Sequence, residues 1–227
     1  MDLLEALIRT GLTKSESELY VALNREGELT GYEAAKVTGI PRANTYQSLA
    51  SLVEKGGAFI VEGKAQKFTA VPPQEYCRNM LSQLTEVTAE ILRQCPGLRK
   101  QSEPYITING FRHIVLKIKN IIQDAKERVY ISVSEADLPI ILPELENAIQ
   151  RGLKVVAITS GNMQIGGAIL YKINRTPGQI RLIADSTTVL TGAITGSIED
   201  TCLFSKNKPL VELIKESLKN EIKLAEQ

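Results

Sequence analysis

The side chains best suited to a chemical task lie along residues 39–56, where an arginine, amides and hydroxyls alternate with apolar residues. An apolar stripe at helical spacing consists of Thr45, Leu49, Leu52 and Val53. The remaining side chains project elsewhere and comprise Arg42, Asn44, Tyr46, Gln47, Ser48 and Ser51. On a helix anchored by its apolar side, such groups suit contacts with base edges and phosphates in a major groove. We therefore predict a recognition helix that binds double-stranded DNA.

Residues that could support catalysis or hold a metal are sparse. The chain has one histidine, His113, and three widely separated cysteines, Cys77, Cys95 and Cys202. They form no C-x-x-C pair and no Cys/His cluster at metal-ligand spacing. We expect no metal and no cofactor, and a helix-surface or packing role for His113. The cysteines are expected to be buried as small hydrophobic residues, with redox sensing as the alternative.

The segments before the recognition helix carry signals for further helices. Thr13 with Glu16, and Thr30 with Glu33, each form a capping box in which the hydroxyl and the carboxylate satisfy backbone amides. The apolar residues expected around the resulting helices are Leu19, Tyr20, Ala22 and Leu23, then Tyr32, Ala35 and Val37. In Gly39-Ile40-Pro41, glycine permits a bend and proline presets a helical turn. The predicted order is helix, helix, turn, helix.

The residues after Gly56-Gly57 change to an extended pattern. Two apolar runs, residues 58–61 and 66–71, flank a glycine-containing turn at 62–65 and predict a β-hairpin. A hairpin at this place is the wing of a winged helix-turn-helix. Lys64 and Lys67 near its tip are expected to touch the DNA backbone, with ordinary solvation as the alternative.

A connecting helix is predicted between Pro72-Pro73 and Pro96-Gly97. A heptad seam of alternating four- and three-residue spacing is formed by Cys77, Leu81, Leu84, Thr88, Ile91 and Cys95. Pairing of two copies through this seam would place two recognition helices about 34 Å apart and require a pseudo-palindromic operator. The alternative is that the seam packs on its own chain, so that a homodimer would form through the C-terminal domain.

Composition indicates a globular chain of two modest domains. The 227 residues are 43% apolar and 23% charged, with a formal net charge of +1. Attraction to DNA must therefore be local, and we expect modest, salt-sensitive affinity. No apolar stretch reaches the roughly 18 residues of a membrane span, and the N-terminus lacks the basic start of a secretion signal. We expect a cytoplasmic protein.

The second half of the sequence alternates strand and helix signals. The expected strands are residues 105–108, 128–133, 153–159, 179–184, 188–194 and 201–204, and the expected helices are 111–125, 142–151 and 210–225. This order predicts an α/β domain with a mixed sheet. The predicted domains are residues 1–72, a linker helix at 73–97, and residues 104–227.

The first third of the chain resembles the TrmB family of transcriptional regulators. The residues that carry the resemblance are Gly11-Leu12-Thr13 with Glu16 and Tyr20, Gly39-Ile40-Pro41-Arg42 with Thr45-Tyr46, Leu49 and Leu52, Lys55-Gly56, and Ala70-Val71-Pro72-Pro73. The resemblance implies a dimeric DNA-binding regulator whose downstream domain senses a small effector. Whether it represses or activates does not follow from the sequence.

The second half looks like the phospholipase D-like fold that often follows such a winged helix. The active-site motif of that superfamily is H-x-K-x4-D-x6-G-S-x-N, and one register places Asp185 and Gly192 at its Asp and Gly positions. The positions of His, Lys, Ser and Asn hold Gly178, Ile180, Ala193 and Thr195. Because glycine and isoleucine can neither form a phosphoenzyme nor neutralise a phosphoryl oxygen, the resemblance implies an inactive cleft that could bind an effector.

A polar rim is expected around that cleft, at the ends of neighbouring strands. Its residues are Ser132, Ser134, Glu135, Thr159, Ser160, Asn162 and Asp185. Ordinary turn chemistry is the alternative for these side chains. Residues 161–178 are expected to cover the cleft or to form a surface excursion. Two other functions stay open: an effector-independent architectural or adaptor protein, and, remotely, a phosphodiesterase.

Overall fold

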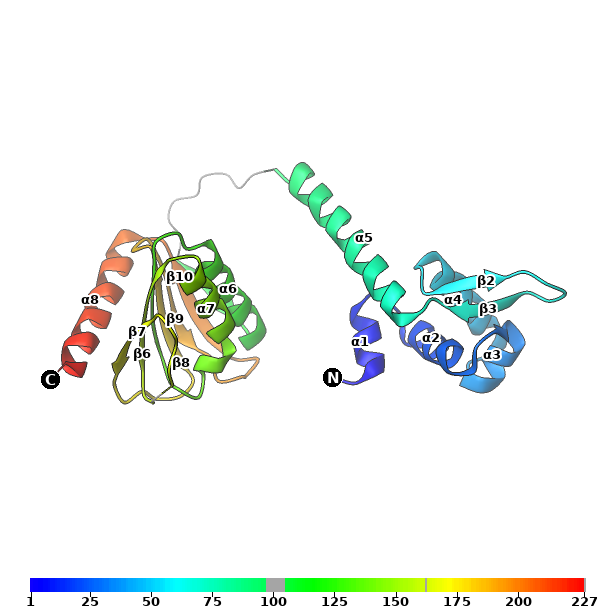
Figure 1. Cartoon of the computed structure of the whole chain (residues 1–227), viewed down its shortest axis with the longest axis horizontal. Coiled ribbons are helices and arrows are strands. Elements are labelled where there is room, and N and C mark those ends of the chain that lie inside the picture. The colour runs from blue at the N-terminus through cyan, green and yellow to red at the C-terminus, as the bar shows by residue number, and fades with distance from the viewer. Residues whose placement is uncertain (97–104, 162, 227) are drawn as a thin grey trace. The chain divides into compact units, whose positions relative to one another are not determined.

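The computed structural model describes residues 1–96, 105–161 and 163–226, and the chain forms two compact units, residues 1–97 and 98–227 (Figure 1). The first unit contains four short helices, α1 (Leu3–Arg9), α2 (Lys14–Glu26), α3 (Gly31–Thr38) and α4 (Arg42–Glu54). Its strands β1 (Leu29–Thr30), β2 (Ala58–Val61) and β3 (Lys67–Ala70) form an antiparallel sheet in the order β1-β3-β2. The winged helix-turn-helix is confirmed, and β1 adds a short strand that the sequence did not signal.

Both predicted capping boxes are present. Glu16 Oε2 accepts the backbone N–H of Thr13 at 2.7 Å, and Thr13 Oγ1 accepts that of Glu16 at 3.3 Å. The corresponding distances at Thr30 and Glu33 are 2.8 and 3.2 Å. Gly39 adopts the left-handed conformation at φ 74° after α3, and Pro41 is the residue that precedes the first turn of α4. The two capping boxes fix where α2 and α3 begin, and the turn from Gly39 to Pro41 fixes where α4 begins.

The core of this unit is built from the predicted stripes. The side chains of Leu19, Leu23, Leu49 and Leu52 are fully buried. Tyr20 is buried as well, and its hydroxyl donates to the carbonyl of Val71 at 2.9 Å, which ties α2 to the end of the hairpin. The expectation that Tyr32 and Val37 pack around α3 is wrong, because both are exposed and Ala34 and Ala35 make that contact instead.

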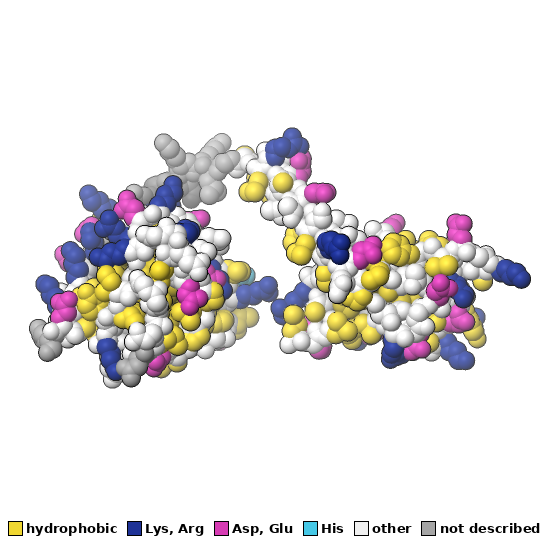
Figure 2. Space-filling view, in the orientation of Figure 1, with side chains coloured by type: hydrophobic (Ala, Val, Ile, Leu, Met, Phe, Trp, Pro, Cys, Tyr) yellow, Lys and Arg dark blue, Asp and Glu magenta, His cyan; other side chains and the backbone are white. Residues whose placement is uncertain are grey.

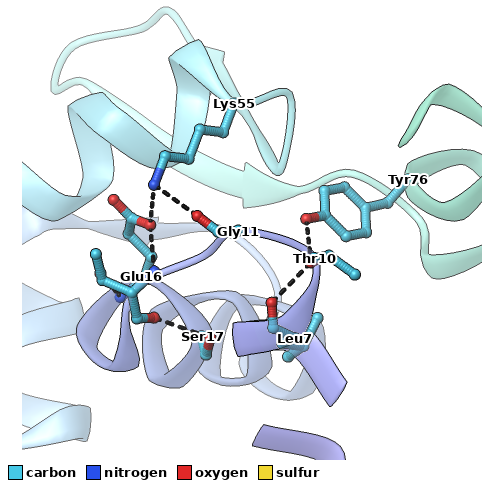
Figure 3. A network of polar contacts seen from close by, with 8 residues as sticks. Leu7, Thr10, Gly11, Glu16, Ser17, Lys55 and Tyr76 are labelled. Atoms are coloured by element: carbon cyan, nitrogen blue, oxygen red, sulfur yellow. Dashed lines mark hydrogen bonds and ion pairs between the residues drawn. The ribbon is translucent and has the colours of Figure 1, made fainter. Parts of the chain in front are cut away.

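An ion pair between the buried Glu16 and the partly exposed Lys55 joins the end of α4 to the start of α2. Lys55 Nζ lies 2.7 Å from Glu16 Oε2 and donates to the carbonyl of Gly11 at 3.0 Å (Figure 3). Burial raises the pKa of Glu16, but hydrogen bonds from Lys55, the Thr13 amide and Ser51 together hold it below its ordinary value. The ionised carboxylate thus stabilises the fold at neutral pH, and this contribution is lost as the pH falls through the lowered pKa.

Helix α5 (Pro73–Gln94) leaves the winged unit from a fixed root. Tyr76 is its buried residue, and its hydroxyl lies 2.9 Å from Thr10 Oγ1 (Figure 3). The ring centroid of Tyr76 lies 5.2 Å from that of Tyr20. Thr10 in turn donates to the carbonyl of Leu7 at 2.7 Å. The first turn of α5 is therefore held by both α1 and α2.

The second unit is a seven-stranded mixed sheet in the order β4-β10-β9-β8-β5-β6-β7. Its strands are β4 (Ile106–Asn109), β5 (Arg128–Val133), β6 (Lys154–Thr159), β7 (Ile169–Lys172), β8 (Gln179–Ala184), β9 (Thr188–Ala193) and β10 (Thr201–Ser205). The pairs β5/β6 and β6/β7 are parallel and the others antiparallel. The predicted mixed sheet is confirmed. The view of residues 161–178 as only a cover or excursion is wrong, because they contain the edge strand β7.

Helices cover both faces of this sheet (Figure 1). Helices α6 (Phe111–Asp124) and α7 (Leu142–Gln150), with a short 3-10 turn at Leu138–Ile140, pack on one face over the largest core cluster. Helix α8 (Lys208–Ala225) packs on the other face, where Val211, Ile214 and Leu218 meet Ile158, Ile183 and Val189. Alternate residues of β5 and β8 consequently serve two separate cores.

Candidate nucleic-acid interface and ligand-binding region

The two sides of α4 differ as the sequence predicted. Thr45, Leu49 and Leu52 are buried, whereas Arg42, Asn44, Tyr46 and Gln47 are exposed. Thr45 Oγ1 also donates to the carbonyl of Ile40 at 3.1 Å, which fastens the first turn of the helix to the preceding loop. The chain therefore presents an arginine and two amide side chains on a helix whose opposite side is fixed in the core.

Two tyrosines order the start of this exposed surface. The guanidinium of Arg42 lies 4.3 Å from the ring centroid of Tyr32, within the range of a cation–π contact. The ring of Tyr46 lies against the backbone of Gly31, where an added Cβ would stand 2.4 Å from Cε1 of that ring. Tyr32 and Tyr46 are each 51% exposed. Sequence reasoning missed Tyr32, because it assigned this aromatic residue to the core.

The other predicted DNA-contacting residues are placed less uniformly. Ser48 and Ser51 are half-buried, and Ser51 lies near Glu16, whose pKa it helps to lower. Lys64 is exposed in the turn of the β2–β3 hairpin, and a basic side chain is visible at the tip of that hairpin (Figure 2). Lys67 Nζ lies 3.6 Å from Glu28 Oε2, but both side chains are about half exposed and such pairs are weak. The surface formed by Arg42, Asn44, Tyr46, Gln47 and Lys64 is thus the accessible part of the predicted set.

The predicted seam of α5 is exposed. Leu81, Leu84 and Ile91 are 67%, 63% and 54% exposed, and Cys77, Thr88 and Cys95 are exposed as well. Figure 2 shows apolar side chains at the surface of this helix. Val87 and Leu92 widen the apolar side. The seam is thus not covered by the other residues of the winged unit that the structure describes, and the expectation that Cys77 and Cys95 are buried is wrong.

Part of the predicted effector rim does gather in the second unit. The ends of β5 and β6 bring Glu135 to Ser160, whose Oγ accepts the Glu135 backbone N–H at 3.2 Å. The Glu135 carboxylate accepts the N–H of Met163 at 3.0 Å. Ser134 Oγ donates to Asp137 Oδ2 at 2.6 Å. These polar groups meet because β5 and β6 are parallel, so their carboxyl ends share one edge. The predicted Asn162 lies outside the described residues.

Three members of the predicted rim are buried, and Ser134, which is 1% exposed, is one of them. Ser132 is fully buried in β5, and its hydroxyl donates to Glu221 of α8 at 2.8 Å. Thr159 is buried at the end of β6, and within the described ranges its Oγ1 has no hydrogen-bond partner. Neither Ser132 nor Thr159 opens onto the edge formed by Glu135 and Ser160.

The placement of Asp185 in the same rim is wrong. Strand β8 is antiparallel to β5, with Ala184 opposite Val129, so Asp185 lies at the other end of the sheet. Asp185 Oδ1 accepts the N–H groups of Glu127 and Arg128, and Oδ2 accepts that of Lys126. These bonds hold the hairpin after β8, where Asp185 adopts φ 50°. The residue therefore has a structural role.

Asp185→Asn is expected to destabilise the second unit by about 1–3 kcal/mol at pH 7, because an amide cannot accept all three N–H groups. Burial raises the pKa of Asp185, but the three backbone N–H groups, from Arg128, Lys126 and Glu127, and the charge of Arg128 lower it below its ordinary 3.8. Its contribution is therefore present above pH 3.8 and is lost as the pH falls through the lowered pKa. Urea unfolding at several pH values, with hydrogen exchange at residues 126–128, measures both effects. Asp124→Asn, at an exposed site, is the control, and equal loss in both variants would contradict this role.

Buried residues stand at the His and Lys positions of the phospholipase D-like active-site motif. Ile180, at the Lys position, is 1% exposed within the cluster under α6 and α7. Gly178, at the His position, has φ 77°, and an added Cβ would stand 2.8 Å from Cγ2 of Thr195. Its N–H donates to Asp137 Oδ2 at 2.7 Å. A larger side chain at 178 would therefore be strained and would meet Thr195.

The other candidate chemical groups lie apart from one another. His113 is exposed on α6, as expected, with Nδ1 3.3 Å from the carbonyl oxygen of Asn109. Cys202 is buried, and burial raises its pKa to about 12, so its thiol is inert. Within residues 1–96, 105–161 and 163–226, no group of three or more His, Cys, Asp or Glu residues could hold a metal ion. Among the helices that the structure describes, none has both the length and the apolar character needed to cross a membrane.

Comparison with known proteins gives the same two-part division. The family description "Sugar-specific transcriptional regulator TrmB" matches residues 7–74, and "Transcriptional regulator TrmB, EBD N-terminal subdomain" matches residues 105–214. YrhO of Bacillus subtilis, an uncharacterised protein, is 30% identical over 75% of this chain and 63% of its own length. The sugar-sensing transcriptional regulator TrmBL1 of Pyrococcus furiosus is 29% identical over 58% of this chain and 40% of its own length. The chain thus spans less than two thirds of these relatives.

Among solved structures, the chain matches the archaeal chromatin protein TrmBL2 with a TM-score of 0.46 and 21% identity over 96% of both chains. They also include Nuc of Salmonella typhimurium, a phospholipase D family member, with a TM-score of 0.43 and 19% identity over 53% of this chain and 94% of that one.

Proposed function

This chain belongs to the TrmB family of transcriptional regulators, and on that basis we propose that it is a dimeric, sequence-specific DNA-binding regulator modulated by a small polar effector. One observation carries the proposal: Arg42, Asn44 and Gln47 face outward from a helix whose other side is locked in the core. Exposed groups of this kind on a rigid element can read base edges without first being ordered.

In this proposal α4 enters the major groove and the β2–β3 hairpin lies along the phosphate backbone. Arg42 provides the charged contact at the start of the helix, with Tyr32 holding its guanidinium in place. Lys64 contacts phosphate from the hairpin. Because the net charge of the chain is only +1, binding depends on these local charges and falls as salt rises.

Dimerisation is proposed through the exposed seam of α5. The seam presents Leu81, Leu84 and Ile91 on a 22-residue helix, and burying them against a second copy would remove their apolar surface from water. The fixed root at Tyr76 then sets the direction in which each winged unit leaves the paired helices. Two α4 helices about one DNA turn apart would read a pseudo-palindromic operator.

Effector sensing is proposed for the second unit, at the edge where the half-buried Glu135 and Ser160 meet. The family description names sugars, and hydroxyl and carboxylate groups are suited to bind such polar ligands. An effector would act by favouring one arrangement of the dimer, which requires different affinities for the two arrangements. We propose no catalytic activity, because Gly178 and Ile180 supply neither a nucleophile nor a cation at the motif positions.

The proposal is tested by footprinting the protein on the DNA that flanks its own gene, with and without cell extract. We expect two protected half-sites whose centres lie about 10 base pairs, or a multiple of that, apart. Uniform coverage without a preferred site would support an architectural protein instead. A thermal-shift screen of sugars tests the sensing part, since an effector that binds the folded state must raise the melting temperature.

A further inference from the structure

A second polar cluster lies on the α8 face of the sheet, close to the ends of the strands β5 and β7. It consists of Arg175 after β7, Arg181 in β8, Ser132 in β5 and Glu221 in α8. Glu221 Oε1 accepts Arg175 Nη1 at 3.2 Å and also Arg181 Nη1, and Glu221 Oε2 accepts Ser132 Oγ at 2.8 Å. Ser217 Oγ lies 3.5 Å from Arg181 Nη1. We call these residues the arginine cluster.

The arginine cluster is distinct from the filled motif positions. Ile180 belongs to the core under α6 and α7, whereas its neighbour Arg181 projects to the opposite face of β8 and meets α8. Arg175 follows the edge strand β7, which sequence reasoning did not identify. Neither arginine was therefore among the predicted site residues.

Charge in the arginine cluster is not balanced. Two guanidinium groups face one carboxylate, and the side chains of Arg175, Glu221 and Arg181 are only 11%, 13% and 31% exposed. Nη2 of Arg175 is buried and, among the described residues, has no hydrogen-bond acceptor. Burial lowers the pKa of Arg175, and repulsion from Arg181 adds to that effect, while Glu221 opposes it. Buried polar groups are rarely left unpaired, so an excess donor at a buried cation calls for a further acceptor.

We propose that Arg175 and Arg181 bind the phosphate group of a phosphorylated small molecule, and that Glu221 is the internal anion that this ligand displaces. The proposal rests on the effector-sensing function inferred above. A phosphate monoester carries close to two negative charges and three acceptor oxygens, so it can neutralise both guanidinium groups and fill the free donor. A single carboxylate leaves one charge and one N–H unmatched.

Displacement of Glu221 would release the last turns of α8. The buried residues that anchor this helix, Val211, Ile214 and Leu218, precede Glu221. After it, Ile222 is half-buried against the same core, and Lys223 and Leu224 are exposed. The end of α8 is therefore held by less buried surface than its first part, and its release would cost the contact of Ile222. This gives ligand binding a local structural response.

The test is a calorimetric titration of inorganic phosphate, at pH 7.5 and constant ionic strength, into the full chain and four variants. Removing the internal competitor in Glu221→Gln should tighten phosphate binding by about tenfold or more, the worth of one charge-assisted hydrogen bond. Glu216→Gln removes an equal charge from the exposed side of α8 and should bind phosphate as the unaltered chain does. The double variants Arg181→Gln/Glu221→Gln and Arg175→Gln/Glu221→Gln should lose the gain.

The proposal is overturned if Glu221→Gln binds phosphate no more tightly than Glu216→Gln, or if the double variants keep the gain. Acetate binding as tight as that of phosphate would overturn the assignment to a phosphate group. If Glu221→Gln fails to fold, the proposal is tested by hydrogen exchange of the backbone amides of residues 219–225 in the unaltered chain. Phosphate must accelerate this exchange relative to chloride. Because no measurement includes DNA, failure here leaves the DNA-binding proposal standing, and failure of the footprint leaves this site standing.

Discussion

Arg42→Ala is expected to weaken binding to the protected DNA site by at least about tenfold, the loss typical of a side chain that contacts a base or a desolvated phosphate. Arg42 is the charged group at the start of α4, and its guanidinium is already positioned 4.3 Å from the ring centroid of Tyr32. Its removal deletes an attractive charge and leaves the core unchanged, because Arg42 is exposed. Fluorescence anisotropy with the footprinted duplex and a scrambled duplex measures the loss.

Three variants sharpen this result. Tyr32→Phe retains an aromatic face for Arg42, whereas Tyr32→Leu does not, so only the leucine variant should weaken binding. Arg25→Ala removes an exposed arginine from the end of α2 and is the matched control for charge. Lys64→Ala should weaken binding equally on both duplexes and reduce the salt slope by about one. Unchanged affinity in both Arg42→Ala and Lys64→Ala would move the interface off α4 and the hairpin.

Leu84→Asp is expected to convert the proposed dimer to a monomer at micromolar concentration. Leu84 lies in the middle of the α5 seam, and two copies of the aspartate would face each other in an apolar interface, where burying like charges is strongly unfavourable. Since Leu84 is 63% exposed within its own chain, the substitution should leave the winged unit folded. Sedimentation equilibrium reports the mass, and circular dichroism reports the fold.

Gln83→Asp is the control for Leu84→Asp, because it introduces the same charge at an exposed neighbour outside the seam. It should remain a dimer. The monomeric Leu84→Asp variant should also lose most of its affinity for a two-half-site duplex, since each half-site is then bound independently. If Leu84→Asp sediments as a dimer, the pairing surface lies elsewhere, and the exposed seam needs another partner.

Local signals in the sequence were sufficient for most of the first unit. The capping boxes at Thr13 and Thr30 fixed where two helices begin, and the spacing of Thr45, Leu49 and Leu52 identified the buried side of α4. These predictions succeeded because each depends on residues within one or two helical turns. The glycine-containing turn at 62–65 located the hairpin for the same reason.

Features that depend on strand direction could not be obtained this way. The misplacement of Asp185 followed from assuming that successive strands run parallel, whereas β8 runs antiparallel to β5. Strand β7 is a short edge strand with half its residues exposed, so it lacks a clear apolar alternation. The arginine cluster joins residues 132, 175, 181 and 221, and only the tertiary fold brings such distant positions together.

The buried Tyr76 couples helix α5 to the core of the winged unit. The helix is held by its first two turns, where Tyr76 contacts Thr10 and Tyr20 and Met80 packs against the same core, whereas the residues from Leu81 to Gln94 are exposed. A helix resists bending, so torque applied near Gln94 reaches Tyr76 with little loss. There it acts on a ring wedged between two helices of the same core as α4. The winged unit, including α4, must therefore turn as one body with helix α5.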